Sequence, residues 1–399
     1  MSQDIRDFVT SSCDLLALGE PTHREPAFAW VRNELFVQLV EHGFRSIALE
    51  TDRVAALTVN DFVQEGIGTL DAVMTEGFSH GFGQLDANRH LVAWMREYNQ
   101  NQPPTERLTF HGFDAPMETT SAPSPRRYLE HARDYLTRDL ALAADADLAL
   151  ALDLDVDFAS LLGDDERWSR QEAVWHAAMS VGATPEAEKL RSLADDMLTS
   201  LYARAPQLIA STSRAEWRRA KTHLTAGLGL LRYHKQASQR IEEAARISSL
   251  GATRDALMAQ NLLDIRAVEA HRGPTLLFAH NVHLQPTLIT MPMADMVTNW
   301  YGAGDIMKSL SDEHHTFVAG SLGRNETFGL REPEPDTYEG FLQRRITPWG
   351  LTTTTTFPSS ARTRTDPTPE QGYFPLDEAT LAGADAILHI NDGPTITTP

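Results

Sequence analysis

The sequence predicts an α/β fold with a mostly parallel, doubly wound sheet and a large helical insertion that caps the carboxyl edge of its strands. Two observations predict it. Short apolar runs alternate with helical segments at both ends of the chain, at 15–20, 45–50, 107–114, 275–279, 316–320 and 384–390. Strand signals are missing from about 125 to 272, where long helical patterns follow one another.

The first unit has the pattern strand, loop, helix. Its apolar run stops at Glu20 and His23, which is typical of a buried parallel strand followed by a loop. Pro26 suits the first turn of a helix, and apolar residues then recur at helical spacing up to Gly43. His23 is therefore expected beside a helix N-terminus, whose positive end disfavours imidazolium and favours a neutral, proton-accepting ring.

The later segments extend this pattern. After the second run, residues 51–52 are expected to cap a helix through Phe62. Further helices are expected at 86–99, 125–136, 167–179, 186–203, 214–238 and 254–271, while 144–157 is ambiguous between helix and loop. The Thr- and Pro-rich stretches 352–356 and 358–375 predict irregular surface or edge structure. We expect a core of 1–124 and 251–399, with 125–250 as the cap.

Composition excludes several function classes. The 399 residues include 55 acidic and 35 basic side chains, a net charge of −20, which argues against nucleic acid or anionic membrane as partners. The charge serves solubility first, and it would attract a cationic small-molecule substrate. Cys13, the only cysteine, excludes an internal disulfide and a cysteine-rich metal cage. Neither a signal peptide nor a membrane span is indicated, so we expect a cytoplasmic protein. The oligomeric state stays open.

Ionisable side chains follow four of the predicted strands, where α/β sheets bind ligands. Alone, each would be explained as a helix cap or a structural histidine. Because the carboxyl ends of parallel strands share one edge, we expect these side chains to converge in one crevice. The four pairs are Glu20 with His23, Glu50 with Asp52, His111 with Asp114, and His280 with His283.

The same residues resemble the erythromycin esterase family. Similar blocks occur in the family's order at 19–23, 48–50, 94–99, 110–114, 254–263 and 279–283. The resemblance implies an α/β sheet with a helical cap and a hydrolase that opens macrolide lactones by activating water. It implies that His23 is the essential base and that the cleft is lined by Glu20, Glu50, Arg32, His280 and His283.

Two features depart from the family pattern. Arg24 stands where members usually carry glycine, and the stretch after Phe78 lacks the usual aromatic residues. Arg24 could lower the pKa of His23, narrow the pocket or bind a substrate carboxylate. These departures affect the expected identity of the substrate more than the expected type of reaction.

Ester hydrolysis needs a base for water, a site for the oxyanion and a proton for the leaving alkoxide. The sequence has no Gly-x-Ser-x-Gly elbow, so we expect no covalent intermediate. We expect His23 to deprotonate water, Glu20 or Glu50 to fix its tautomer, and His283 or His280 to polarise the carbonyl, helped by Arg254 or Arg32. Substrate contacts are expected from Arg24, Arg32, Asp52, His111 and Asp114.

Other functions stay open. The histidines and glutamates could supply a zinc or manganese site, but no His-Glu-x-x-His helix is present, so we expect no metal and no cofactor. The substrate of a hydrolase could be an antibiotic. Alternatively, the same base could serve a biosynthetic tailoring enzyme that performs cyclisation, elimination or amide chemistry. A non-enzymatic protein could use the histidines to bind haem or a hydrophobic cation.

Overall fold

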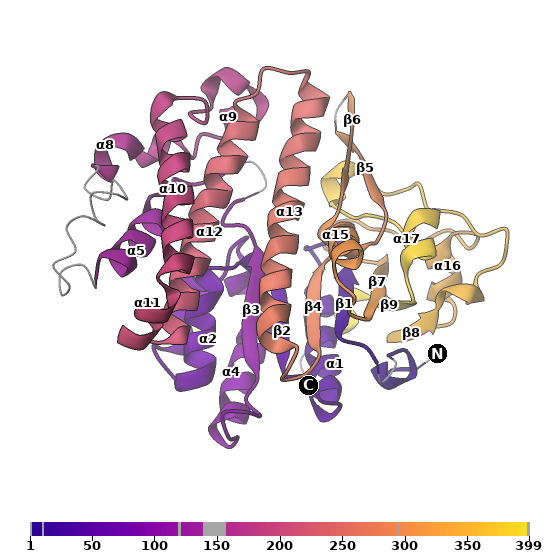
Figure 1. The fold of residues 1–399 in the computed structure, drawn as a ribbon. Coiled ribbons are helices and arrows are strands. Elements are labelled where there is room, and N and C mark those ends of the chain that lie inside the picture. The colour runs from indigo at the N-terminus through magenta and orange to yellow at the C-terminus, as the bar shows by residue number, and fades with distance from the viewer. Residues whose placement is uncertain (1, 10–11, 119–120, 139–156, 294, 397–399) are drawn as a thin grey trace.

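The computed structural model describes residues 2–9, 12–118, 121–138, 157–293 and 295–396 (Figure 1). Its centre is a seven-stranded sheet in the order β3-β2-β4-β1-β7-β9-β8, in which only β8 is antiparallel to its neighbour. The predicted α/β fold with a mostly parallel sheet is confirmed. The strands are β1 (Leu15–Glu20), β2 (Ser46–Asp52), β3 (Thr109–Asp114), β4 (Thr275–His280), β7 (His315–Arg324), β8 (Trp349–Thr353) and β9 (Ala386–Asp392).

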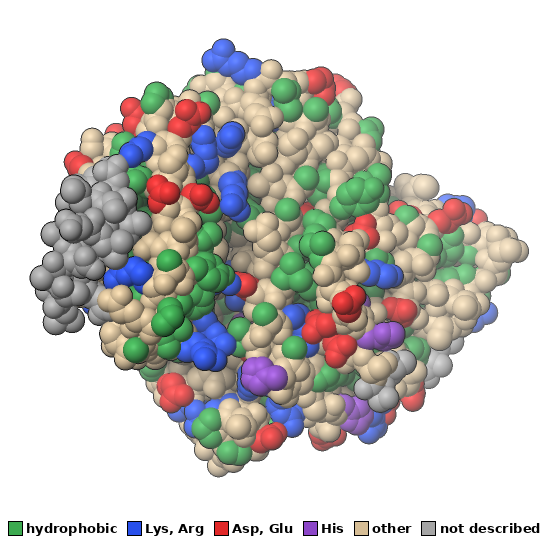
Figure 2. Space-filling view, viewed as in Figure 1, with side chains coloured by type: hydrophobic (Ala, Val, Ile, Leu, Met, Phe, Trp, Pro, Cys, Tyr) green, Lys and Arg blue, Asp and Glu red, His purple; other side chains and the backbone are tan. Residues whose placement is uncertain are grey.

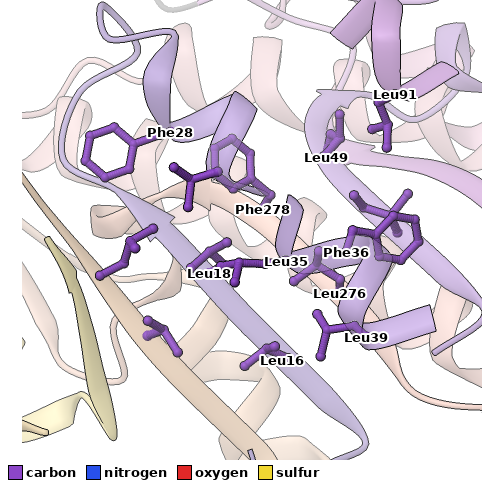
Figure 3. Packing of buried hydrophobic residues seen from close by; sticks show 14 of the residues in the cluster. Leu16, Leu18, Phe28, Leu35, Phe36, Leu39, Leu49, Leu91, Leu276 and Phe278 are labelled. Atoms are coloured by element: carbon purple, nitrogen blue, oxygen red, sulfur yellow. The ribbon is translucent and has the colours of Figure 1, made fainter. Parts of the chain in front are cut away.

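One face of the sheet is covered by the helices that connect the first three strands. These helices are α1 (Ala27–Glu41), α2 (Ala55–Glu65), α3 (Leu70–Glu76) and α4 (Asp86–Gln100). Figure 3 shows how α1 lays Phe28, Leu35 and Phe36 against Leu18 and Phe278 of the strands. Alternate strand residues point to opposite faces, so every second apolar residue serves this core.

The other face packs against the helices of the second half. Leu15, Ala17 and Leu277 point to this side, where they meet Met258 and Leu262 of α13 (Glu243–Glu269). Both faces of β1, β2 and β4 are therefore buried, which explains their nearly continuous apolar runs. The remaining helices of this half are α14 (Asn281–Leu284), α15 (Ala303–Leu310), α16 (Tyr338–Gln343) and α17 (Glu378–Gly383).

The chain between β3 and α13 is helical and has an apolar core of its own. Figure 1 shows α12 beside α13, whose first half extends past the strands, and α10 packed on α12. The helices are α5 (Arg126–Thr137), α8 (Phe158–Leu162), α9 (Glu172–Trp175), α10 (Pro185–Ala203), α11 (Ala205–Ser211) and α12 (Arg214–Ala237). The stretch 144–157, ambiguous in the sequence, lies outside the described residues except for Asp157.

Four local predictions differ from the structure. The helix start predicted directly after 51–52 lies too early, because β2 continues to Asp52 and α2 begins only at Ala55, although the Asp52 carboxylate accepts the Val54 N–H ahead of that helix. The single helix predicted over 167–179 is wrong as well; its apolar residues 173–175 are adjacent rather than spaced along one helical face, and only the short α9 and a 3₁₀ turn at Ala177–Met179 form there. Helix α13 begins at Glu243 rather than at 254, because Glu242 caps it by accepting the Ala245 N–H. The hairpin of β5 (Leu288–Met293) and β6 (Met296–Tyr301) was not predicted, since Pro292 lies inside its first strand.

The surface shows no dominant charge patch in the view of Figure 2, where acidic and basic side chains are interspersed. Within the described ranges, every helix is too short or too polar to cross a membrane.

Candidate active site

The sheet register brings three predicted site residues to one place. Strands β1 and β4 are neighbours, and Glu20 stands directly opposite His280. Strand β2 pairs with the other side of β4, so Glu50 lies one residue beyond the pair Leu49 and Phe278. The Glu50 carboxylate accepts the backbone N–H of His280 at 2.9 Å. This bond fixes Glu50 at the carboxyl edge of the sheet.

Three nitrogen groups converge on one oxygen of Glu50. Oε1 lies 3.7 Å from His23 Nε2, 3.4 Å from His283 Nε2 and 3.3 Å from Arg254 Nη2. Burial alone would raise the pKa of the Glu50 carboxyl, but His283, His23 and Arg254 outweigh it and hold the pKa well below its usual range. Glu50 is therefore an ionised carboxylate surrounded by donors.

His23 is held from its other side. Nδ1 lies 2.8 Å from Glu20 Oε1, so Nε2 points toward Glu50, and the ring keeps 37% of its surface exposed. Burial lowers the pKa of His23, but Glu50 and Glu20 outweigh it and raise the pKa to about 10. The neutral ring predicted from the nearby helix N-terminus is thus wrong for the free protein. Two carboxylates in contact outweigh a partial helix-end charge.

His283 has a matching arrangement that the sequence analysis did not predict. Its Nδ1 lies 2.8 Å from Asp255 Oδ1, and Asp255 also accepts the Trp300 indole N–H at 2.7 Å and the Ala303 backbone N–H at 2.9 Å. Burial lowers the pKa of His283, but Asp255 and Glu50 outweigh burial, so the pKa is raised above its usual value. The signal for Asp255 was its place next to Arg254 in the resembling helical block.

His280 has a different role from His283. Its Nδ1 accepts the Val282 N–H at 3.2 Å, and the ring also bonds the backbone of Pro21. Burial and the nearby charge of His23 lower the pKa of His280 to about 3, so it is neutral. The ring packs edge-on against His23 and Phe374. Of the two histidines, His283 is the one with a nitrogen available toward Glu50.

Arg254 is held by a second carboxylate. Asp114 bonds it twice, at 2.6 and 3.1 Å, and also lies 2.8 Å from His80 Nε2. His80 in turn contacts Glu118 through Nδ1. Asp114 is fully buried and does not line the cavity, so it orients Arg254 rather than meeting a ligand. His80 and Glu118 lie on loops, where the sequence pattern gave no signal for their pairing.

Besides Asp114, three predicted substrate contacts lie away from the cavity. Arg32 is buried beneath it, bonded to Asn33 and Asn88, and burial lowers its pKa to about 9. Asp52 pairs with Arg127. His111 lies inside β3 rather than at its end, because that strand continues to Asp114, and its ring meets Glu269 of α13.

The cluster forms the floor of a cavity of about 630 Å³. Its walls are mostly apolar and come from the insertion, from α13, from the β5–β6 hairpin and from the loop before α17. Glu50, His23, His280, His283, Arg254 and Arg24 all line it. The wall residues include Val174, Trp175, Tyr233, Ile247, Leu250, Met291, Met293, Trp300 and Phe374.

The arrangement of the histidine and carboxylate side chains bears on the alternative of a zinc or manganese site. Across the described residues, no three His, Cys, Asp or Glu side chains are grouped so that they could hold a metal ion. The imidazole Nδ1 atoms of His23 and His283 are occupied by carboxylates, and their Nε2 atoms meet the same glutamate. The geometry is that of paired acids and bases.

Fold and site together define an α/β protein with a histidine–carboxylate centre at the carboxyl edge of its sheet. The erythromycin esterase family model matches residues 39–388, and the chain belongs to this family. The match covers Glu50, Arg254, His280 and His283, whereas Glu20 and His23 precede it. No curated protein sequence matches the chain.

Solved structures share the fold. A Bacillus cereus protein is 16% identical over 97% of this chain and 90% of that chain, with a TM-score of 0.69. A mutant of the erythromycin esterase EreC in its open conformation is 18% identical over 96% and 91%, with a TM-score of 0.65. A succinoglycan biosynthesis protein is 16% identical over 96% and 88%, also with a TM-score of 0.65. At these identities the likeness concerns the fold.

Proposed function

We propose that the protein hydrolyses a bulky ester or macrolactone by general-base activation of water at His23, without a covalent intermediate. One observation carries the proposal: His23, His283 and Arg254 present nitrogens within 3.7 Å of the same Glu50 oxygen at the floor of a cavity. Ester hydrolysis needs a proton acceptor, an oxyanion site and a proton donor within one such space.

In this proposal, neutral His23 takes a proton from water through Nε2. Glu20 holds Nδ1 and thereby orients the ring. The water oxygen forms a bond to the carbonyl carbon while its proton moves to His23. Since the pKa of His23 is about 10 in the free protein, the neutral ring is the minor form at pH 7. We therefore expect kcat/KM to rise with pH until His23 has lost its proton.

Arg254 and His283 act on the other side of the carbonyl. The Arg254 guanidinium and the His283 Nε2–H stabilise the negative oxygen of the tetrahedral intermediate. When the carbon–oxygen bond of the ester breaks, protonated His283 donates its proton to the leaving alkoxide. Asp255 keeps His283 in the orientation that this transfer needs. The products are a carboxylic acid and an alcohol, or the opened hydroxy acid of a lactone.

The cavity supports a bulky substrate. A volume of about 630 Å³ lies in the range typical of sites for drug-sized ligands, and its walls are mostly apolar. Family membership and the shared fold with the esterase EreC favour an ester or lactone over other substrates of this size.

Mass spectrometry tests the proposal directly. The purified protein is incubated with a panel of macrolides, simpler macrolactones and bulky aryl esters, and products are followed by mass. Hydrolysis adds the mass of one water to a lactone. A product with unchanged mass, or with the mass of one water removed, would instead indicate a tailoring reaction. Tight binding of panel members without any product would indicate a binding protein.

A further inference from the structure

We propose that Arg24 makes the cavity selective for substrates that carry a carboxylate next to the ester or at one end of an apolar body. The inference rests on the proposed function for the position of the ester at His23 and Glu50. Its independent support is the environment of Arg24, which follows His23 in the sequence and lines the same cavity.

Contacts from a distant loop hold the Arg24 side chain at the cavity rim. Nη1 donates to the backbone carbonyl of Glu370 at 2.7 Å. The guanidinium lies over the Phe328 ring, 5.3 Å from its centroid. Its stem passes Gly372, which has a left-handed φ of +60° and also lines the cavity. The guanidinium is therefore positioned before any ligand arrives.

Among the described residues, no carboxylate forms an ion pair with this cation. The two arginines that line the cavity differ: Arg254 forms ion pairs with Asp114 and Glu50, whereas none of the described carboxylates lies within 4 Å of Arg24. The acidic residue that follows Arg24 in the sequence and the one whose backbone it bonds use their carboxylates elsewhere. Glu25 is buried and bonds Asn325 and the Ala27 N–H, and Glu370 offers Arg24 its carbonyl while its carboxylate bonds Thr368.

A substrate carboxylate fits what Arg24 still offers. Within the described part of the chain, Nε and Nη2 have no hydrogen-bond partner, and this edge of a guanidinium binds a carboxylate with two parallel bonds. The net charge of −20 repels anions at long range, so the preference has to come from the local contact. The expected ligand is amphipathic, with its apolar part against the Met291, Met293 and Trp300 wall.

Turnover of a matched ester pair tests the selectivity. Mono-para-nitrophenyl glutarate and para-nitrophenyl valerate have acyl chains of equal length and differ in one terminal carboxylate. We expect kcat/KM to favour the glutarate by about ten- to a hundred-fold, mainly through KM, as charge-assisted hydrogen bonds predict. Arg24→Met keeps an apolar stem and should abolish the preference, and Arg24→Lys should restore part of it. Arg344→Met is the control, because Arg344 also donates to a single backbone carbonyl but lies outside the cavity lining.

Binding without turnover separates this inference from the proposed function. Calorimetry compares naphthylbutyrate with naphthylbutanol for the same three variants and the parent protein. Tighter binding of the carboxylate that disappears only in Arg24→Met supports the inference, even if no ester is hydrolysed. Equal affinity for both probes, no binding of either, or an equal loss in Arg344→Met would overturn it.

Discussion

Two buried glutamates of this protein have nearly the same partners and different surroundings. Glu50, near the end of β2, faces His23, His283 and Arg254. Glu269, near the end of α13, faces His111, Arg272 and Thr109. Each is a carboxylate with a histidine and an arginine, and each has a pKa held down by those partners against burial.

The distances separate the two clusters. Glu269 lies 2.9 Å from His111 and 2.7 Å from Arg272, both ordinary bonding distances, and it is not among the residues that line the cavity beside Glu50. The three nitrogens around Glu50 Oε1 lie at 3.3 to 3.7 Å, and the cluster borders a cavity of about 630 Å³. A saturated set of partners stabilises the fold, whereas a looser set beside a cavity can exchange a partner for water or substrate.

The largest expected effect comes from removing the proposed base. His23→Asn keeps a polar side chain but removes the group that accepts the proton. We expect kcat for any hydrolysed ester to fall by about 10²- to 10⁴-fold, with little change in unfolding midpoint because the His23 ring is partly exposed. Activity is measured at saturating substrate. His42→Asn, an exposed residue at the end of α1, is the matched control.

One result would contradict the role of His23 as the base. If His23→Asn retained more than about half of the parent activity, His23 would not be the base. The Glu50 cluster would then have no catalytic role, and Glu50 would be a structural carboxylate like Glu269.

The second prediction concerns Glu269. Glu269→Gln leaves Arg272 and His111 next to a neutral amide, and breaking a buried pair in this way costs about 3 kcal/mol or more. The urea unfolding midpoint should fall accordingly, while kcat/KM of the folded protein stays within about two-fold, a change well below 1 kcal/mol. A large loss of kcat/KM with unchanged stability would show that the two clusters are coupled. Glu269 could then no longer be described as purely structural.

The contrast also explains what the sequence could predict. The positions of Glu20, Glu50 and His280 at or near the strand ends were predictable, because apolar runs that stop at polar residues mark the carboxyl edge of a parallel sheet. His111 was placed at the same edge although the predicted strand already ran on to Asp114; it lies inside β3, and its contact with Glu269 of α13 depends on tertiary packing. His111 is therefore part of the interface between sheet and helix, whereas Asp114, the residue predicted beside it, orients Arg254.

Other contacts depend on tertiary structure that no local pattern encodes. Asp255 and Trp300 meet only because the β5–β6 hairpin packs on α13. His80 meets Asp114 through a loop with a left-handed residue at His80 itself, φ 56°. The charge state of His23 also needed the structure, because the distances to Glu20 and Glu50 decide its pKa.

The third prediction tests those distances. The Glu50 carboxylate stabilises the protonated form of His23, so Glu50→Gln should lower the pKa of His23 from about 10 by about one to three units. The sign follows: loss of the neighbouring negative charge favours the neutral ring, and the rising limb of residual activity should move to lower pH. Imidazole ¹⁵N chemical shifts of His23 measure the pKa directly. Glu269→Gln provides the control, and an unchanged His23 titration in Glu50→Gln would mean that Glu50 does not set its charge.

The smallest expected effect comes from Trp300, which supports the Glu50 cluster through Asp255. Trp300→Phe keeps the aromatic wall but removes the indole N–H that Asp255 accepts at 2.7 Å. Asp255 then keeps its bonds to His283 and to the Ala303 N–H, so His283 is held less firmly rather than released. A lost hydrogen bond to a charged acceptor is worth about 1.5 to 3 kcal/mol, only part of which reaches the transition state through His283. We therefore expect kcat to fall by about three- to ten-fold with KM nearly constant, a loss of about 1 kcal/mol. Trp94→Phe, a tryptophan on the opposite face, should leave kcat unchanged. If Trp300→Phe raised KM and left kcat intact, Trp300 would act only as a wall of the cavity, and Asp255 would hold His283 without its help.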